Sequence, residues 1–339
     1  MLLLLGIDTS CDDTSCAVVE DGRRVLSNIV SSQVDLHSKY GGVVPEIASR
    51  RHLELMVPVV EEALRTADVS LKDIDGIAVT QGPGLLGSLL VGVSFAKSLA
   101  YGRGIPLVSV HHLEAHIYAN FLREEVPSFP LLNLVVSGGH SDLILMKAHG
   151  IYEVLGETRD DAAGEVFDKV AREMGLPYPG GPFLDKIADS GDPDRFFFPS
   201  PKIECEGYNY SFSGIKTRAL LQLESCPDRT RCIPHLAASF RKAVVEQLLG
   251  RVEEVLDIDG ASAKALGVSG GVAANSLLRK EAELLSRRRG IPLFIPPRDL
   301  CTDNGAMVAA AGFYRLKAGK IAGPDLNAFS DLELESWGR

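Results

Sequence analysis

The sequence predicts an α/β protein built from two related lobes. The apolar run Leu2–Ile7 ends in the polar turn DTSCDDTS and continues as CAVVED, which is the pattern of a strand, a tight turn and a second strand. The segment Leu131–Met146 repeats this pattern around the turn SGGHSD. Two copies of one unit, about a domain length apart, indicate a duplicated architecture.

Strands and helices alternate through the rest of the chain, which predicts mixed sheets flanked by helices. Gly76–Thr80 is predicted as a strand, and the helix after its Gly/Pro turn is expected to end at Gly104. The runs IPLVSV, AKALGV and IPLFIP are further predicted strands. A helix is expected to begin at about Ala274.

The boundary between the lobes is expected at the segment PSFP, residues 127–130, because proline interrupts regular structure there. This gives an N-terminal lobe of residues 1–128 and a C-terminal lobe of residues 129–303. The last predicted helix, within residues 304–325, is expected to return to the N-terminal lobe.

The composition excludes some classes of protein. A net charge of −10 argues against a broad basic surface for nucleic acid, and the basic segments Ser49–His52 and Ser286–Gly290 are each explained as solvated helix faces when taken alone. The six cysteines are scattered without a CxxC motif, which predicts reduced thiols in a cytoplasmic protein. No apolar run reaches the length of a membrane helix, so no membrane partner is expected.

The segment HHLEAH raises the question of a metal. On a helix, His112 and His116 lie on one face, one turn apart, and this geometry suits a divalent transition metal. The alternative is a pair of polar residues with no ligand. The order differs from the HExxH motif of zinc proteases, and Glu114 is rotated about 200° from His112, so it is expected to face away from a metal. Asp303, in LCTDNGAM, is a candidate third ligand, and the set suits Fe(II) or Zn(II).

Two turns of the type VSGG follow predicted strands, at residues 136–141 and 268–275. Glycine pairs let successive backbone amides point at an anion, although tight turns also need glycine for geometry alone. Together with the DTS turn they favour a nucleotide or acyl-phosphate site. There is no P-loop motif.

A set of motifs occurs in order along almost the whole chain: GIDTSCDDTS, YGGVVPEIASRRH, QGPGLLGSLLVG, HHLEAH, VSGGHSDL, DDAAGEVFDKVAREMGLPYPGGP, SFSGIKT, GVSGGVAANSLLR and CTDNGAM. This set resembles the tRNA N6-threonylcarbamoyladenosine synthase transferase family, called TsaD in bacteria and once labelled an O-sialoglycoprotein endopeptidase. The resemblance implies the actin-like ATPase (ASKHA) fold of two duplicated lobes. It also implies an acyltransferase that moves threonylcarbamoyl from L-threonylcarbamoyl-AMP to N6 of the adenosine just 3′ of the anticodon, in tRNAs reading codons that start with A.

The resemblance implies roles for particular residues. Metal ligands fall on His112, His116 and Asp303, with one divalent ion per subunit and Fe(2+) expected ahead of Zn(2+). The family's acidic pair falls on Asp12 and Asp13 as catalytic residues. Substrate contacts fall on Val135, Val136, Ser137, Gly138, Gly139, Asp168, Gly181, Asp185 and Asn275.

Partners follow from the same resemblance. They are tRNA, L-threonylcarbamoyl-AMP, a degenerate paralogue of the same fold (TsaB-like) and a P-loop ATPase subunit (TsaE-like). The chain departs from the family's usual ETSCDET in having Asp8 and Asp13 in place of glutamate, so each carboxylate is one methylene shorter.

Asp12 is the candidate for a general base, because an exocyclic adenine amine needs a carboxylate to take its proton as the C–N bond forms. The alternative for Asp12 is a turn cap between two strands. Two other functions stay open: an ATPase or kinase of the same fold and, less favoured, a metalloprotease.

Overall fold

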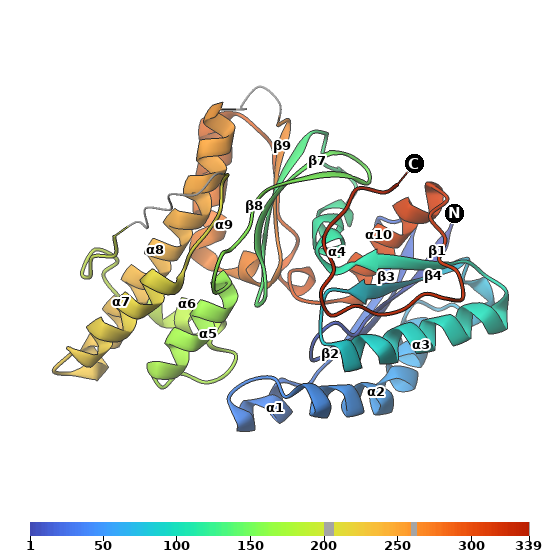
Figure 1. The fold of residues 1–339 in the computed structure, drawn as a ribbon, viewed down its shortest axis with the longest axis horizontal. Coiled ribbons are helices and arrows are strands. Elements are labelled where there is room, and N and C mark those ends of the chain that lie inside the picture. The colour runs from blue at the N-terminus through green and yellow to red at the C-terminus, as the bar shows by residue number, and fades with distance from the viewer. Residues whose placement is uncertain (200–206, 259–262, 339) are drawn as a thin grey trace. The chain divides into compact units, whose positions relative to one another are not determined.

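The computed structural model describes residues 1–199, 207–258 and 263–338, and its ribbon is drawn in Figure 1. The chain separates into two compact units. Unit 1 is formed by Met1–Val126, His149–Tyr152 and Asp299–Arg339, and unit 2 by Pro127–Ala148 and Glu153–Arg298.

Unit 1 contains a mixed five-stranded sheet in the order β3-β2-β1-β4-β5. The central strand β1 pairs antiparallel with β2 and parallel with β4. All six residues of β1 are buried, as expected for a strand covered on both faces. The strands are β1 (Leu3–Asp8), β2 (Asp13–Glu20), β3 (Arg24–Ser32), β4 (Gly76–Gly82) and β5 (Leu107–His111).

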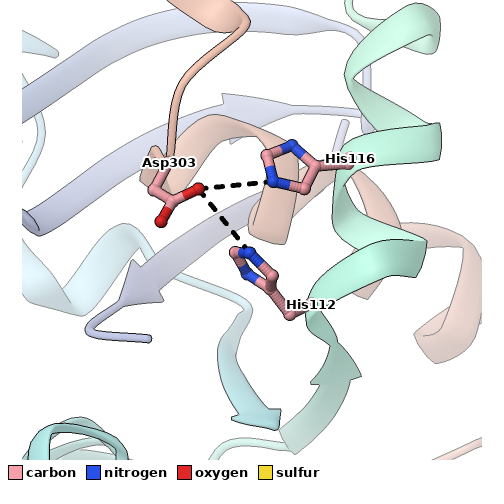
Figure 2. Close-up of side chains that lie close together, drawn as sticks. All are labelled: His112, His116 and Asp303. Carbon is pink, nitrogen blue, oxygen red and sulfur yellow. Dashed lines mark ion pairs between the residues drawn. The ribbon is translucent and has the colours of Figure 1, made fainter. Parts of the chain in front are cut away.

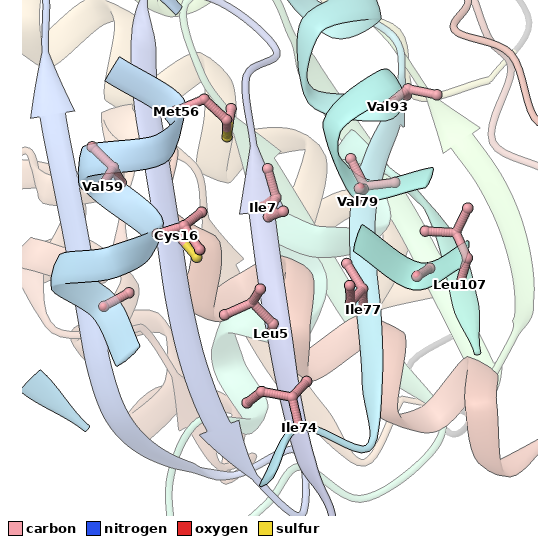
Figure 3. Packing of buried hydrophobic residues seen from close by; sticks show 14 of the residues in the cluster. Leu5, Ile7, Cys16, Met56, Val59, Ile74, Ile77, Val79, Val93 and Leu107 are labelled. Carbon is pink, nitrogen blue, oxygen red and sulfur yellow. The ribbon is translucent and has the colours of Figure 1, made fainter. Parts of the chain in front are cut away.

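Helices cover both faces of this sheet. On one face, Leu5 and Ile7 form a buried apolar core with residues of α2 and α3, including Met56 and Val93 (Figure 3). On the other face, α10 lies so close to β1 that a Cβ atom on Gly6 would be 2.1 Å from the carbonyl oxygen of α10's first residue, and glycine permits this approach. The helices of unit 1 are α1 (Val34–His37), α2 (Pro45–Thr66), α3 (Leu86–Arg103), α4 (His112–Tyr118) and α10 (Gly305–Lys317).

Unit 2 repeats the sheet of unit 1. Its order is β10-β9-β6-β7-β8, and its central strand β6 pairs antiparallel with β7 and parallel with β9. In both units the central strand therefore forms a hairpin on one side and a parallel pair on the other, and the predicted duplication is confirmed. The strands are β6 (Leu131–Val136), β7 (Ser141–Ala148), β8 (Ile151–Gly156), β9 (Ala265–Ser269) and β10 (Leu293–Phe294).

The helices of unit 2 pack in a connected set, with α6 against α5 and α8, and α8 also against α7 and α9. Among the described residues, no helix combines the length and the apolar run that crossing a bilayer requires. The helices are α5 (Ala163–Glu173), α6 (Gly180–Ala188), α7 (Ser213–Glu224), α8 (Arg229–Ile258) and α9 (Ser276–Arg289).

The prediction of reduced thiols is wrong for one pair of cysteines. Cys226 and Cys232 form a disulfide, because the short connection between α7 and α8 brings their Cα atoms to 6.2 Å. Cys11 and Cys16 are free thiols, as predicted. Cys205 lies outside the described residues.

Candidate metal centre and substrate site

The histidine pair lies at the start of a short helix in unit 1. Strand β5 ends at His111, whose Nδ1 accepts a hydrogen bond of 3.2 Å from the backbone N–H of Leu113 and caps α4. His112 is therefore the first residue of α4, and His116 follows one turn later on the same face. Their ring centroids are 4.7 Å apart.

Asp303 reaches the same place from the residue before the cap of α10. Asn304 caps that helix, accepting a hydrogen bond from Met307 N–H at 3.0 Å. Oδ1 of Asp303 lies 3.3 Å from Nε2 of His116 and 3.6 Å from Nε2 of His112 (Figure 2). The structure thus brings together all three residues of the predicted ligand set, whose ligand atoms lie within 4.8 Å of one another.

These three residues could hold a metal ion. His116 is fully buried, and within the described part of the chain neither of its ring nitrogens has a hydrogen-bond partner. An unsatisfied buried polar group is costly, and coordination through Nε2, the nitrogen that faces Asp303, would remove the cost at that atom. Two imidazoles and one carboxylate are a donor set that suits Fe(II) or Zn(II).

A buried carboxylate, Asp8, lies beside this set. Asp8 ends β1 with no exposed surface and accepts a hydrogen bond of 3.1 Å from Ser10 Oγ, which also lies 3.5 Å from Oδ2 of Asp303. Burial, and then the charge of Asp303, raises the pKa of Asp8 to about 8. The sequence marked Asp8 only as a departure from a family pattern. Its place at the end of a buried strand was the signal that it belongs to the site.

The acidic pair lies in the same unit as the histidines, with Asp12 at the end of the turn after β1 and Asp13 as the first residue of β2. Asp12 is half-buried, and its backbone carbonyl accepts a hydrogen bond from Gln33 N–H at 3.3 Å. Burial raises the pKa of Asp13 to about 7; a hydrogen bond from Ser32 lowers it, and the charges of Asp303 and Asp12 raise it. Asp13 therefore lies within electrostatic reach of the third candidate ligand.

His52 holds this turn and was not foreseen as part of the site. The segment Ser49–His52 was explained above as a solvated helix face, but His52 is fully buried in α2. Its Nε2 lies 3.0 Å from the carbonyl oxygen of Cys11, and its Nδ1 lies 2.7 Å from Thr14 Oγ1. Because a carbonyl only accepts, Nε2 carries the hydrogen. Burial lowers the pKa of His52, so the neutral ring accepts from Thr14 at Nδ1.

The first glycine turn of unit 2, which contains Gly138 and Gly139, has open space beside both glycines. Val135 and Val136 are buried at the end of β6, and Ser137 continues into the turn. At Gly138 and Gly139 a Cβ atom would meet no described atom within 4 Å, and neither residue has a left-handed φ. Neither packing nor backbone conformation within the described residues therefore requires glycine at these two positions.

The second glycine turn differs from the first. Gly270 has a φ of +89°, and a Cβ atom there would lie 2.2 Å from the carbonyl oxygen of Val136. The fold itself therefore requires glycine at residue 270. The turn brings the end of β9 against the end of β6.

The remaining predicted substrate residues are linked by hydrogen bonds within unit 2. Asp168 of α5 accepts from Gly181 N–H at 3.0 Å, and Asn275 caps α9 by accepting from its third residue at 3.0 Å. Asp185 of α6 accepts from the backbone N–H of Ser276 at 2.9 Å and from Arg241 at 2.8 Å. The two carboxylates thus join α5, α6, α8 and α9, whereas Asn275 caps α9 alone.

Solved structures of other proteins share this architecture. A crystal structure of HypF from T. kodakarensis matches with a TM-score of 0.61 at 18% identity, covering 93% of this chain and 48% of that chain. Component A of the (R)-2-hydroxyglutaryl-CoA dehydratase of Acidaminococcus fermentans matches with a TM-score of 0.54 at 16% identity, covering 94% and 100%. At this identity the likeness shows the fold alone, and the predicted actin-like ATPase fold is confirmed.

Proteins related in sequence share a much larger fraction of identical residues with this chain. A family model for TsaD, described as tRNA N6-adenosine threonylcarbamoyltransferase, matches residues 24–310. The protein of that name from Symbiobacterium thermophilum is 56% identical over 334 residues, which cover 98% of this chain and 97% of the relative. The one from Carboxydothermus hydrogenoformans is 52% identical over 332 residues, covering 98% of each. With both matches spanning most of its length, this chain belongs to the TsaD family of tRNA N6-adenosine threonylcarbamoyltransferases.

Proposed function

We propose that this protein transfers the threonylcarbamoyl group from L-threonylcarbamoyl-AMP to N6 of the adenosine just 3′ of the anticodon, in tRNAs reading codons that start with A. AMP is the other product. The observation that carries the proposal is the match, over nearly the whole chain, to relatives named for this transfer. The reaction belongs in the cytoplasm, where its tRNA substrate is found.

The proposed cofactor is one divalent metal ion, held by His112, His116 and Asp303, with iron favoured over zinc. The support is the donor set of two imidazoles and a carboxylate, together with the unsatisfied, buried ring of His116. Such an ion supplies Lewis acidity toward ligand oxygens and stabilises negative charge on them.

The proposed proton acceptor is Asp12. The N6 amine attacks the carbonyl carbon of the threonylcarbamoyl group and a C–N bond forms. The C–O bond to the phosphate breaks, and its electron pair leaves with AMP. The proton lost from N6 passes to the Asp12 carboxylate. Asp13 is the weaker candidate for this role, because its side chain is one methylene shorter than the glutamate usual in the family, whereas Asp12 matches the family pattern.

The proposed contacts to threonylcarbamoyl-AMP are made by residues 135–139 and by Asp168, Gly181, Asp185 and Asn275. The support for the first group is the open space at Gly138 and Gly139, which glycine leaves free for a ligand. Backbone amides in such a turn bind phosphate oxygens.

The proposed partners are tRNA, a TsaB-like paralogue of the same fold and a TsaE-like P-loop ATPase. A net charge of −10 leaves the chain poorly suited to hold tRNA unaided. In unit 1, an apolar groove between α2 and α3 offers a surface for the paralogue. Its lining includes Leu53 and Val57, which are 67% and 51% exposed.

The protease alternative has no support at Glu114. A zinc protease needs its glutamate as a base toward the metal-bound water. Glu114 instead binds Arg315, Trp337 and Tyr152 with no exposed surface.

The test is incubation with L-threonylcarbamoyl-AMP, unmodified tRNA and the two partner proteins, followed by mass spectrometry of the nucleosides. We expect threonylcarbamoyladenosine with the full set, and little or none from this chain alone. A His116→Ala variant with the same partners is the matched control. If the full set, with metal bound, yields no modified adenosine, the proposed reaction is wrong; full multiple turnover by the single chain would reject the need for partners.

A further inference from the structure

The segment HHLEAH contains two residues, His111 and Glu114, that are not candidate ligands, and both bind the C-terminal segment of the chain, residues 329–337. We propose that this C-terminal segment is a positioning element for the metal centre: it sets the place of α4 relative to Asp303 without supplying a ligand. The inference rests on the metal site proposed above, and it concerns unit 1 alone.

The first contact fixes the residue that begins the metal helix. Nε2 of His111 lies 2.8 Å from the backbone carbonyl oxygen of Leu332. Since a carbonyl only accepts, Nε2 carries the hydrogen, and the neutral ring accepts at Nδ1. Nδ1 is the atom that accepts from Leu113 N–H and caps α4. The carbonyl of the C-terminal segment therefore selects the tautomer that starts the helix at His112.

The second contact ties the two ligand-bearing elements to each other. Glu114 is fully buried, and such a carboxylate needs several donors. Its Oε1 accepts from Trp337 Nε1 at 2.6 Å and from Tyr152 OH at 2.8 Å, and its Oε2 accepts from Arg315. Arg315 lies on α10, the helix that begins just after Asp303. Glu114 thus fixes α4, which bears the histidines, to α10.

Further contacts hold Trp337 in place. Gly150 has a φ of +72°, and a Cβ atom there would lie 2.0 Å from the indole ring, so the ring packs directly on this glycine. The backbone N–H of Trp337 donates to Gly150 O at 2.8 Å, and Ser336 Oγ bonds both backbone groups of Tyr152. The guanidinium carbon of Arg315 lies 5.4 Å from the centre of the indole ring. The indole N–H is therefore held at Glu114 by an ordered set of contacts.

Partners beyond the ligands themselves typically change metal affinity by about 10- to 100-fold when removed. Trp337→Phe keeps an aromatic ring beside Gly150 but removes the N–H that Glu114 accepts, together with part of the indole ring. We expect this variant to bind Zn(II) about tenfold more weakly than the wild type. Tyr101→Phe is the matched control, because it also removes one aromatic donor but at a side chain that is 91% exposed, and its affinity should be unchanged.

The experiment is a titration of the full chain with Zn(II) against a competing chelator, with thermal unfolding measured in parallel. Wild type and His116→Ala are titrated first. If wild type binds no ion, or if His116→Ala binds as well as wild type, the proposed metal site fails and the inference falls with it. If wild type binds and His116→Ala does not, the Trp337→Phe result decides. Unchanged affinity in Trp337→Phe would then overturn the positioning role while leaving the proposed function intact.

A second readout, the fluorescence of the protein, can be recorded with or without metal. Trp337 is the only tryptophan in the chain, so its fluorescence reports the surroundings of the C-terminal segment. Glu114→Gln removes the charge on which three donors converge, and we expect a red shift of the emission together with weaker Zn(II) binding. If Glu114→Gln leaves both the emission and the affinity as in wild type, the coupling between this segment and α4 is rejected.

Discussion

Nε2 of His52 lies 3.0 Å from the carbonyl oxygen of Cys11, so a buried side chain of α2 holds the turn that leads through Asp12 into Asp13, the first residue of β2. With Thr14 bound at its other nitrogen, His52 contacts the residues on both sides of the acidic pair. A side chain of α2 thus holds the backbone on both sides of the two carboxylates.

We expect His52→Ala to lower the free energy of unfolding by about 2–4 kcal/mol, because it leaves the Cys11 carbonyl and the Thr14 hydroxyl unsatisfied and opens a cavity. The single-turnover rate should fall with it, whereas His52→Gln, which can still donate to the carbonyl, should retain more of both. Arg51→Ala, at an exposed neighbour on α2, is the control. If His52→Ala keeps the stability and the rate of the wild type, the turn after β1 does not depend on His52.

His112→Ala and His116→Ala are each expected to lose bound metal and most transferase activity while the fold survives. A two-histidine, one-carboxylate site retains too few ligands after either change. Metal content by elemental analysis and circular dichroism check the two halves of the prediction. His235→Ala changes a histidine outside the ligand set, and this variant should keep the bound metal. Metal retained in both single variants would remove His112 and His116 from the ligand set.

Asp12→Asn keeps the size and hydrogen bonding of the side chain but cannot take a proton. If Asp12 is the base, the single-turnover rate falls by about 10² to 10⁴ and the affinity for threonylcarbamoyl-AMP changes little. If Asp12 is only a turn cap, the single-turnover rate should fall by a small factor, because asparagine serves nearly as well in that role. Both quantities are measured on the same variant. A near-normal rate rejects the base, and a large loss of affinity makes Asp12 a binding residue.

Asp142 predicts a pH dependence of stability. Its side chain is 7% exposed and Oδ2 has no hydrogen-bond partner among the described residues. Burial, and then the charge of Glu157, raises its pKa from 3.8 to about 7. The folded state holds this proton more tightly than the unfolded state. The stability that protonated Asp142 contributes is therefore fully present below the pKa that Asp142 has in the unfolded chain. It is lost as pH rises through the pKa that Asp142 has in the folded protein.

Asp142→Asn removes this titration. The free energy of unfolding of the variant, relative to that of the wild type, should therefore rise by about 2 kcal/mol between about pH 5 and about pH 8. Urea unfolding at the two pH values measures the gain. Glu224→Gln, an exposed carboxyl in the same unit, should show none. An equal difference at both pH values would mean that Asp142 is ionised with an ordinary pKa.

Asp185→Ala tests whether this carboxylate is structural. It removes one of the two carboxylates that bind the buried guanidinium of Arg241 and the acceptor of the Ser276 N–H at the start of α9, which should cost about 3 kcal/mol of unfolding free energy. Asp189→Ala removes the other carboxylate that binds Arg241; because Asp189 is 64% exposed, this change should cost much less. If Asp185→Ala loses ligand affinity at unchanged stability, Asp185 is a substrate contact and not a structural one.

Local patterns in the sequence were enough for the fold class. Two apolar runs that each break into a polar turn predicted the hairpins β1–β2 and β6–β7, and the structure has both. The four-residue spacing of His112 and His116 predicted a shared helix face, and the rotation of Glu114 predicted that it points elsewhere. These features depend only on the period of a strand or a helix, which neighbouring residues determine.

Other features were decided by tertiary structure, because they join residues distant in the sequence. No local pattern shows that Asp303 meets the histidines, that His52 is buried against Cys11, or that Trp337 reaches Glu114. The two glycine turns look alike in sequence, yet Gly270 is required by contact with β6 while Gly138 has open space around it. The sequence by itself determined which chemical groups are present and how each segment folds. Packing of the segments decided which groups are buried and which of them meet, since burial and long-range contacts belong to the whole fold.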